Sequence, residues 1–331
     1  MARKIRFPVD IAHRETDEVI ETIEGELAKE YYKAADALTE KFAAYMKQFT
    51  DQDAVQKKLL DAGKITEKDY KDWRFRHIMM GKRWKSLLET VAEDYANVNN
   101  IAKSVVHGHM AEVYALNRNF ETYQIQKTGK LTYSFDLYNR KAVEKMWREN
   151  PKLIPDPRPG SKTALRIKKN KDVAWNKKQV QSVVTQAIVQ GQSIPEMARC
   201  LEEVTEKNYD AAVRNARTMM TSAQNAGRED SMKEAVELGV KMKREWVATL
   251  DDRTRHTHRD LHGVRVDVDE PWVTEYGDEI MYPGDPSADA GEVYNCRCTM
   301  RSVVEGFEGN TVTSSSKMGE MSYKDWKEGG R

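Results

Sequence analysis

The stretch that decides the fold reads Asp252-Arg253-Thr254-Arg255-His256-Thr257-His258, and Asn295-Cys296-Arg297-Cys298 follows some forty residues later. Three of the seven histidines and two of the three cysteines lie in this region of the chain. Such clustering indicates a binding site or a small, tightly pinned fold. Helical periodicity also gives way here to strand-like pieces at 246–249 and 264–266, bounded by turn residues. We therefore expect a small α+β domain over residues 244–304.

The chain before this domain is predicted to be helical. Apolar residues recur at three- and four-residue steps over 14–49, and further helices are expected over about 66–98, 99–118, 180–190 and 206–238. Thr66 and Asp69 are spaced as in a capping box, which starts a helix after a turn at Gly63. The sequence thus predicts a mainly α protein with an elongated N-terminal helical region. Its helical second half closes in the small α+β C-terminal domain.

Four segments follow from these patterns. We expect an N-terminal helical region over 1–150, a Pro-rich and basic linker over 151–179, a second domain over 180–308, and a disordered tail over 309–331. Four prolines between 151 and 159 prevent a continuous helix at the start of the linker. Ser, Thr and Gly are frequent in the tail.

Composition restricts the class of protein. The 331 residues are 39% hydrophobic and 32% charged, with a mean hydropathy of −0.77, which fits solvated helices with narrow apolar stripes. The net charge of +1 means that attraction to nucleic acid must come from local patches. No apolar run is long enough to span a bilayer, and the first residues lack the apolar core of a signal peptide. Three cysteines without a framework of pairs predict synthesis in a reducing cytoplasm.

The His/Cys cluster is a candidate zinc site formed by His258, His262, Cys296 and Cys298. His258 and His262 share a face if their segment is helical, and two cysteines separated by one residue can direct both sulfurs at one ion. Arg297 would then have to point away. The alternative is that the cysteines are buried small hydrophobes and that the histidines cap turns or pair with acids.

A metal-dependent nuclease or hydrolase built on the same cluster is a weaker alternative. A histidine beside Asp251 or Asp252 could act as a general base. However, the segment has no nucleophile elbow, no His-Glu-x-x-His and no phosphate loop, and acidic residues surround it. We therefore predict that the chain is not an enzyme.

Two further patterns concern polar surfaces. A basic run at 158–178 predicts either a solvated face or contacts with DNA phosphates, with Trp175 as a stacking or packing residue. Its candidate DNA-binding residues are Arg166, Lys168, Lys169, Lys171, Lys177 and Lys178. Along the helix at 206–238, the polar stripe of Arg217, Thr221, Gln224 and Arg228 favours buried salt bridges to the acidic terminal domain over a solvated face.

Taken together, these motifs resemble the phage Mu protein F-like family of minor head or head-morphogenesis proteins. The resemblance covers about residues 180–304 and includes a helix start at 191–198. Its specificity lies in the order and spacing of Arg217, Thr218, Asn225, Arg228, Trp246, Asp252, Arg253, Thr254, His258, Gly263, Asn295, Cys296, Arg297 and Cys298. The segment at 63–74 is similar to longer minor head proteins from prophages of Gram-positive bacteria.

The resemblance implies a virion structural protein of the capsid interior near the portal, present in the host cytoplasm during assembly. The implied partners are the portal protein, a capsid or scaffolding protein, and packaged phage DNA. Many relatives carry Cys-x-x-Cys where Arg255-His256-Thr257-His258 stands, and they look like zinc binders, whereas only His258 can replace a ligand here. Some relatives carry a fused toxin domain after the head domain, and we expect none after Glu305.

Overall fold

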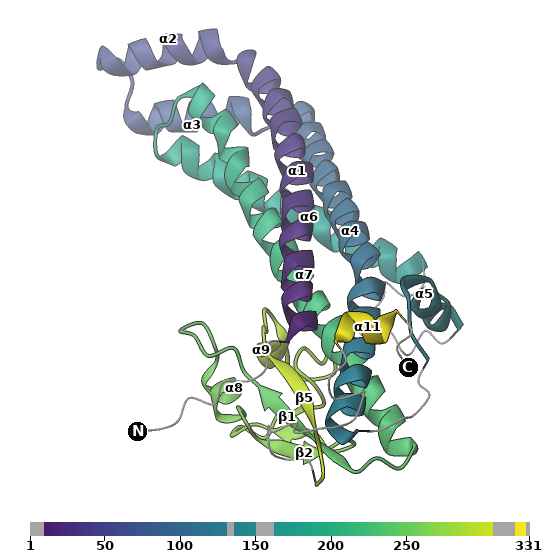
Figure 1. Ribbon diagram of the computed structural model, residues 1–331. Coiled ribbons are helices and arrows are strands. Elements are labelled where there is room, and N and C mark those ends of the chain that lie inside the picture. Colours follow the sequence, from purple (N-terminus) through teal and green to yellow (C-terminus); the bar gives the residue numbers. More distant parts are fainter. Residues whose placement is uncertain (1–9, 131–135, 150–161, 307–321, 329–331) are drawn as a thin grey trace. The chain divides into compact units, whose positions relative to one another are not determined.

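The computed structural model describes residues 10–130, 136–149, 162–306 and 322–328. These residues are mainly helical and include a small sheet near the C-terminal end, which confirms the predicted fold class (Figure 1). The helices before the sheet are α1 (Ile11–Lys47), α2 (Thr50–Asp61), α3 (Glu67–Ile78), α4 (Lys82–Gly129), α5 (Arg140–Glu149), α6 (Lys162–Val189) and α7 (Ile194–Glu237).

The helix starts follow local capping chemistry. Thr66 Oγ1 accepts from the backbone N–H of Asp69 and Asp69 Oδ2 accepts from that of Thr66, so the predicted capping box is present at the start of α3. Ser193 and Glu196 form the same reciprocal pair at the start of α7. The expected helix start at 191–198 is therefore present, and the helix expected over 206–238 is its continuation within α7.

The predicted boundary between helices at 98–99 is wrong. The break lies instead at Gly81, whose φ of 108° suits glycine, and α4 continues from Lys82 to Gly129. Asn99, at the expected boundary, lies inside α4, and its side chain contacts residues of α1 and α7. Its side chain accepts from the Tyr31 hydroxyl at 2.6 Å and donates to Asn208 at 3.0 Å.

The basic run is helical from Lys162 onward, although we predicted a linker over 151–179. Helix α6 begins directly after the Pro-Gly pair at 159–160 and contains good helix formers such as Ala, Leu and Lys. The part of the predicted linker at 150–161 lies outside the described residues.

The chain folds into two compact units. One unit comprises Glu24–Val105 and Pro159–Val213. Its core is formed by large apolar side chains of α1, α4, α6 and α7, including Phe42, Trp84, Tyr95, Val184 and Leu201. The Tyr95 hydroxyl donates to the backbone carbonyl of Leu201 inside this core.

The other unit comprises Met1–Ile23, Val106–Arg158 and Arg214–Arg331, and it contains the sheet. Strands β1 (Met242–Val247), β2 (Arg265–Asp267) and β5 (Thr299–Val304) form an antiparallel sheet in the order β2-β1-β5 (Figure 1). Strands β3 (Trp272–Val273) and β4 (Glu279–Ile280) pair separately, and the short helices are α8 (His256–Asp260) and α9 (Ala290–Val293). The core includes the fully buried side chains of Met232, Trp246, Trp272 and Met300.

Helices α4 and α7 approach each other closely at Gly227. A Cβ atom on Gly227 would lie 2.5 Å from the backbone oxygen of Tyr114 and 3.2 Å from the backbone nitrogen of Arg118. Because both neighbours are backbone atoms, they cannot rotate away. The glycine of the Asn225-Ala226-Gly227-Arg228 motif is therefore a packing requirement.

The end of the chain differs from the predicted disordered tail. Within 309–331, the residues Tyr323–Lys327 form helix α11, capped by Ser322. Trp326 is 2% exposed and packs in a cluster with Ala12, Phe120 and Tyr123, and its indole N–H donates to Gln126. The burial of Trp326 therefore fixes this helix against the rest of its unit, although the surrounding sequence is polar.

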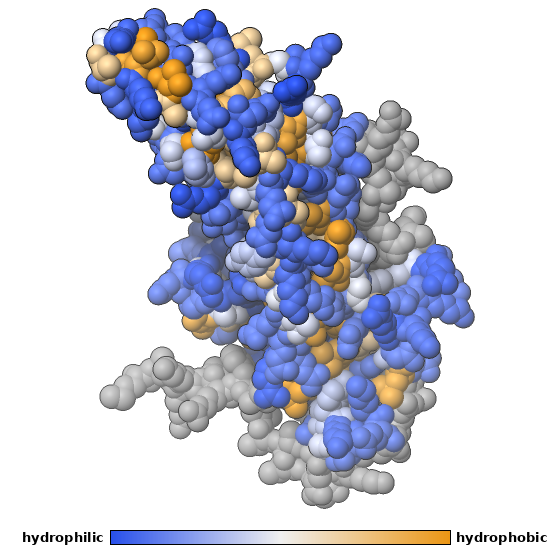
Figure 2. Space-filling model, turned by 90° about the horizontal axis from the view of Figure 1, so that it is seen from above, coloured by the Kyte–Doolittle hydropathy of each residue, from blue (hydrophilic) through white to orange (hydrophobic). Residues whose placement is uncertain are grey.

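The surface is polar, as the mean hydropathy requires. Figure 2 shows a face on which hydrophilic residues predominate and hydrophobic residues form small separate groups. In the described part of the chain, no helix combines the length and apolar character needed to cross a membrane.

Candidate functional site

Side chains on one face of α7 hold the backbone of residues 295–300. Thr218 Oγ1 accepts from the Asn295 N–H at 2.9 Å, and Thr221 donates to the Cys296 carbonyl at 2.7 Å. The carbonyls of Cys298 and Met300 accept from Asn225 at 3.2 Å and from Arg228 at 3.0 Å, while Gln224 donates to the Thr299 hydroxyl at 2.9 Å. We call this set of side chains, Thr218, Thr221, Gln224, Asn225 and Arg228, the α7 seam.

The α7 seam explains the predicted polar stripe. Its residues Thr221, Gln224, Asn225 and Arg228 are at most 5% exposed, so the stripe is buried rather than solvated. The partners differ from the prediction, however. They are mostly backbone groups of the 295–300 segment, not the acidic side chains of residues 251–292.

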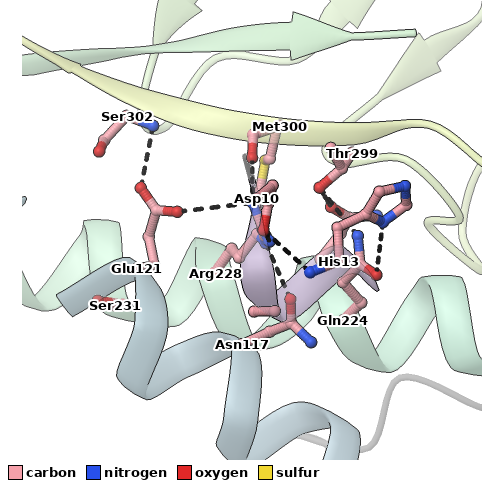
Figure 3. A network of polar contacts seen from close by, with 12 residues as sticks. Asp10, His13, Asn117, Glu121, Gln224, Arg228, Ser231, Thr299, Met300 and Ser302 are labelled. Atoms are coloured by element: carbon pink, nitrogen blue, oxygen red, sulfur yellow. Dashed lines mark hydrogen bonds and ion pairs between the residues drawn. The ribbon is translucent and has the colours of Figure 1, made fainter. Parts of the chain in front are cut away.

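Arg228 is the charged centre of this region (Figure 3). Its Nη1 lies 2.7 Å from Asp10 Oδ2 and 3.8 Å from Glu121 Oε2, and its Nε donates to Asn117 Oδ1 at 3.1 Å. Glu121 also accepts from the backbone N–H of Ser302 at 3.0 Å. Arg228 therefore connects the start of α1, the middle of α4 and strand β5.

The charges of this network shift one another's pKa values. Burial acts to raise the pKa of Asp10, but the Arg228 charge and its hydrogen bond prevail, and the pKa lies below its usual range. For Glu121 burial prevails over the attraction of Arg228, so the pKa of its carboxyl is raised. Keeping Glu121 charged therefore costs more free energy than keeping Asp10 charged.

The structure brings together three of the four predicted zinc ligands. His258 Nδ1 lies 3.7 Å from Cys296 Sγ and 3.5 Å from Cys298 Sγ, and all three residues are 2% exposed. A hydrogen bond between the thiols holds the pKa of Cys298 far below its ordinary value, at about 4, with further help from His258. The same hydrogen bond and burial raise the pKa of Cys296.

The other histidines of the segment lie outside this cluster. Helix α8 ends at Asp260, so His262 is not on its face with His258, and His262 Nδ1 instead accepts from the Ala248 N–H at 3.1 Å. His256 is exposed, with Nδ1 3.0 Å from Asp260 and 3.3 Å from Glu275. An exposed group of this kind is common on protein surfaces and needs no ligand.

A second interaction, between Arg297 and Asp251, joins two segments of the domain next to the cysteines. Arg297 donates from both Nη atoms to the Asp251 carboxylate, each at 2.6 Å, and this interaction lowers the Asp251 pKa well below its usual range. Thr254 donates to the Thr249 carbonyl in the same turn. The neighbouring signature residues Asp252 and Arg253 are exposed, so Asp251 provides the acid that holds Arg297.

Three other signature residues have backbone or packing roles. Gly263 has a φ of 81°, and its N–H donates to the Trp246 carbonyl at 2.8 Å. Asn295 also takes a left-handed backbone, with a φ of 60°, in the turn before the cysteines. Trp246 is fully buried and meets His258 and Trp272 edge to face. Arg217 is half-buried on α7 and has its own polar partners.

The candidate DNA-binding residues lie on α6. Lys169, Lys171 and Lys178 are exposed, and Trp175 is 41% exposed between them. Lys177 lies 2.7 Å from Glu89, which partly neutralises it. The side chains of Arg166 and Lys168 lie outside the described part of the chain.

Sequence patterns did not indicate several residues that complete these contacts. Asp10 and Glu121 lie far from Arg228 in sequence, and Glu292, which lies 3.0 Å from His258 Nε2, is one of many acids in its segment. Arg244 is fully buried at 0% exposure, pairs with Glu229 at 3.0 Å and lies over the Trp272 ring. No sequence pattern marked Arg244, which lies just before the predicted strand-like piece at 246–249.

Comparison with known proteins shows what this part of the chain is similar to. Residues 178–301 match the family described as Phage Mu protein F like protein, and this span contains the α7 seam and the His/Cys cluster. We call this part of the chain the Mu F-like domain, after the family that it is similar to. Minor head protein GP7 of Bacillus phage SPP1 is 32% identical over 123 residues, which are 37% of this chain and 39% of GP7.

Two bacterial proteins match as well. NAD(+)--arginine ADP-ribosyltransferase EFV of Enterococcus faecalis is 33% identical over 208 residues, or 62% of this chain and 40% of EFV. The uncharacterized protein YqbB of Bacillus subtilis is 29% identical over 129 residues, or 38% of this chain and 41% of YqbB. The chain spans about two fifths of the length of each of these relatives. No solved structure matches significantly.

Proposed function

We propose that the protein is a phage minor head protein that acts structurally in head assembly, in the capsid interior near the portal. The observation that supports this proposal is the structural role of the family's signature residues. In the Mu F-like domain, the signature residues Thr218, Asn225 and Arg228 hold α7 to residues 295–300 through hydrogen bonds to the backbone of that segment. Such residues specify a rigid domain, which suits an assembly component better than an enzyme.

The proposed partners are the portal protein, a capsid or scaffolding protein, and packaged DNA. The test of the first is co-expression with the portal protein of the same phage, followed by size-exclusion chromatography with light scattering. We expect a stable complex with a few copies of this chain per portal ring. Complete separation of the two proteins at micromolar concentration would contradict portal binding.

DNA contact is proposed for the exposed face of α6. Lys171, Trp175 and Lys178 are spaced i, i+4 and i+7, so they lie on one side of the helix and combine two phosphate-binding charges with one aromatic ring. Neutralising two lysines that contact phosphates should flatten the dependence of log K on log salt by up to about two units, since each contact contributes about 0.9.

The test compares the double variant Lys171→Gln, Lys178→Gln with a matched double variant. The control replaces two exposed lysines elsewhere in the same compact unit, Lys57 and Lys85, with Gln. The two variants have the same net charge, so only the position of the charges differs. Equal salt dependence for both variants would refute a DNA-binding face on α6.

The rival proposal is that the protein is an enzyme, and the name of one relative indicates which reaction to test. EFV is named as an arginine ADP-ribosyltransferase, so the purified chain is incubated with labelled NAD⁺ and arginine-rich protein acceptors. A parallel incubation with DNA and divalent metals tests the nuclease alternative. We expect neither label transfer nor cleavage; activity that disappears in His258→Gln would refute the structural assignment.

A further inference from the structure

The buried group formed by His258, Cys296 and Cys298 has the dimensions of a metal site. Their ligand atoms all lie within 4.8 Å of one another. In a tetrahedral zinc site, bonds of about 2.3 Å to sulfur and about 2.0–2.1 Å to nitrogen place those atoms about 3.6 Å apart. The two N···S distances here are 3.5 Å and 3.7 Å. A zinc ion thus fits between the three atoms without rearrangement of the backbone.

A carboxylate lies next to the second ring nitrogen of His258. Glu292 Oε2 lies 3.0 Å from Nε2, and the same oxygen accepts from the Thr257 hydroxyl at 2.8 Å. The buried Nε2 makes no hydrogen bond in the structure, so a small rotation of either side chain is needed before Glu292 can accept its proton and leave the Nδ1 lone pair for a metal. Histidine ligands in zinc proteins almost always have such an outer partner.

The backbone around the cysteines directs both sulfurs to one side. The left-handed Asn295 begins the turn, and the Cys298 N–H lies 3.4 Å from Cys296 Sγ. Arg297, between the two cysteines, points to Asp251 instead, where both of its Nη atoms are engaged. The requirement that Arg297 leave the site is therefore met.

We propose that a single zinc ion is bound by Cys296 Sγ, Cys298 Sγ and His258 Nδ1, with Glu292 as the outer partner of the histidine. Among the described residues, no fourth His, Cys, Asp or Glu joins this group, so a water molecule completes the tetrahedron. His262 has no part in the site. The ion joins α8 to the Cys296–Cys298 turn that precedes β5, and its fourth position is open to water.

Zinc binding is independent of any role in head assembly and is measured on the full chain. Protein produced with added zinc is analysed by mass spectrometry of metals, and we expect one zinc per chain. Protein produced with cobalt should show the near-ultraviolet charge-transfer absorption of thiolate bound to Co²⁺. Both measurements use the wild-type protein, so they do not depend on whether a variant folds.

Matched variants identify the ligands. Cys296→Ser, Cys298→Ser and His258→Gln should each lose the stoichiometric zinc and the cobalt absorption. Cys200→Ser replaces the other buried cysteine and His262→Gln the nearest excluded histidine, and both should keep them. Glu292→Gln should retain the metal with an affinity lower by about 10- to 100-fold.

Three results would overturn the proposal. The first is wild-type protein that contains no zinc and does not compete with a chromogenic chelator for added zinc. The second is loss of metal in His262→Gln with retention in His258→Gln. The third is stoichiometric copper in place of zinc, because a trigonal set of two thiolates and one imidazole also suits Cu(I).

Discussion

Replacement of Arg228 by Met should strongly destabilise the unit that contains the sheet. Arg228 is 1% exposed and faces Glu121, whose side chain is 2% exposed. Methionine fills a similar volume but leaves a buried carboxylate without its counter-charge, which costs about 3–5 kcal/mol. Asp10 contributes less to this cost, because its side chain is 27% exposed and water can solvate it.

The cost should depend on pH in a defined direction. Burial already raises the pKa of Glu121, and loss of the Arg228 charge raises it further. A carboxyl with a raised folded-state pKa stabilises the fold below its unfolded pKa of about 4.3 and loses this contribution as the pH rises through the folded value. The difference between wild type and Arg228→Met should therefore widen from acidic to neutral pH.

Hydrogen exchange of strand β5 is the appropriate assay. The two compact units need not unfold together, so a global denaturation midpoint mixes their stabilities, whereas exchange at 299–304 reports the local opening free energy. Arg148→Met, at an exposed position of α5 in the same compact unit as β5, is the control and should change stability by less than about 0.5 kcal/mol.

A second substitution tests the physical cause. Adding Glu121→Gln to Arg228→Met removes the unpaired charge but keeps an acceptor for the Ser302 N–H, so roughly 2 kcal/mol should be recovered. The reasoning fails if Arg228→Met costs less than about 1 kcal/mol, or if Glu121→Gln adds to the loss instead of reducing it.

The remaining predictions concern packing and pH. Gly227→Ala should destabilise by about 1–3 kcal/mol because its Cβ meets the Tyr114 carbonyl, whereas Gly25→Ala, with nothing within 4 Å, should be neutral or gain up to about 1 kcal/mol in urea unfolding. Equal effects at the two sites would contradict the close helix approach. Trp326→Ala should release α11 and cost about 3 kcal/mol, seen as faster proteolysis of the C-terminal end; an unchanged cleavage rate would argue against its docking. Because the pKa of Asp10 is lowered, its contribution is present above its unfolded pKa and is lost as the pH falls through the folded value. Asp10→Asn should therefore flatten the loss of stability in acid, and an acid profile identical to wild type would refute this.

Local sequence signals predicted much of the fold. The mainly α class, the capping box at Thr66 and the strand-like pieces around 246 and 265 all follow from spacing within a few residues, and the structure has them. Strand β5 was missed because its sequence, Thr-Met-Arg-Ser-Val-Val, has no clean alternation and becomes a strand by pairing with β1. Helix α11 was missed for a related reason, since Trp326 acts through a contact two hundred residues away.

The site was predictable where residues share a local pattern and not where they pair over long distances. The sequence grouped Cys296 and Cys298 with His258 as candidate ligands of one ion, and in the structure His258 lies next to both cysteines. The helix that would have added His262 ends before it, so the i, i+4 argument did not apply. The partners of Arg228 come from residues 10, 117 and 121, and no spacing rule connects those positions with position 228.

We propose that this chain is a structural component of phage heads, and the protein composition of purified heads is the decisive measurement. DNA-filled heads of the phage that encodes it are purified by density gradient and analysed by quantitative mass spectrometry, with the portal protein as the internal standard. We expect a few copies of this chain in each head. The proposal would be contradicted if the chain stays in the soluble lysate and heads assembled without it are normal in number, DNA content and infectivity.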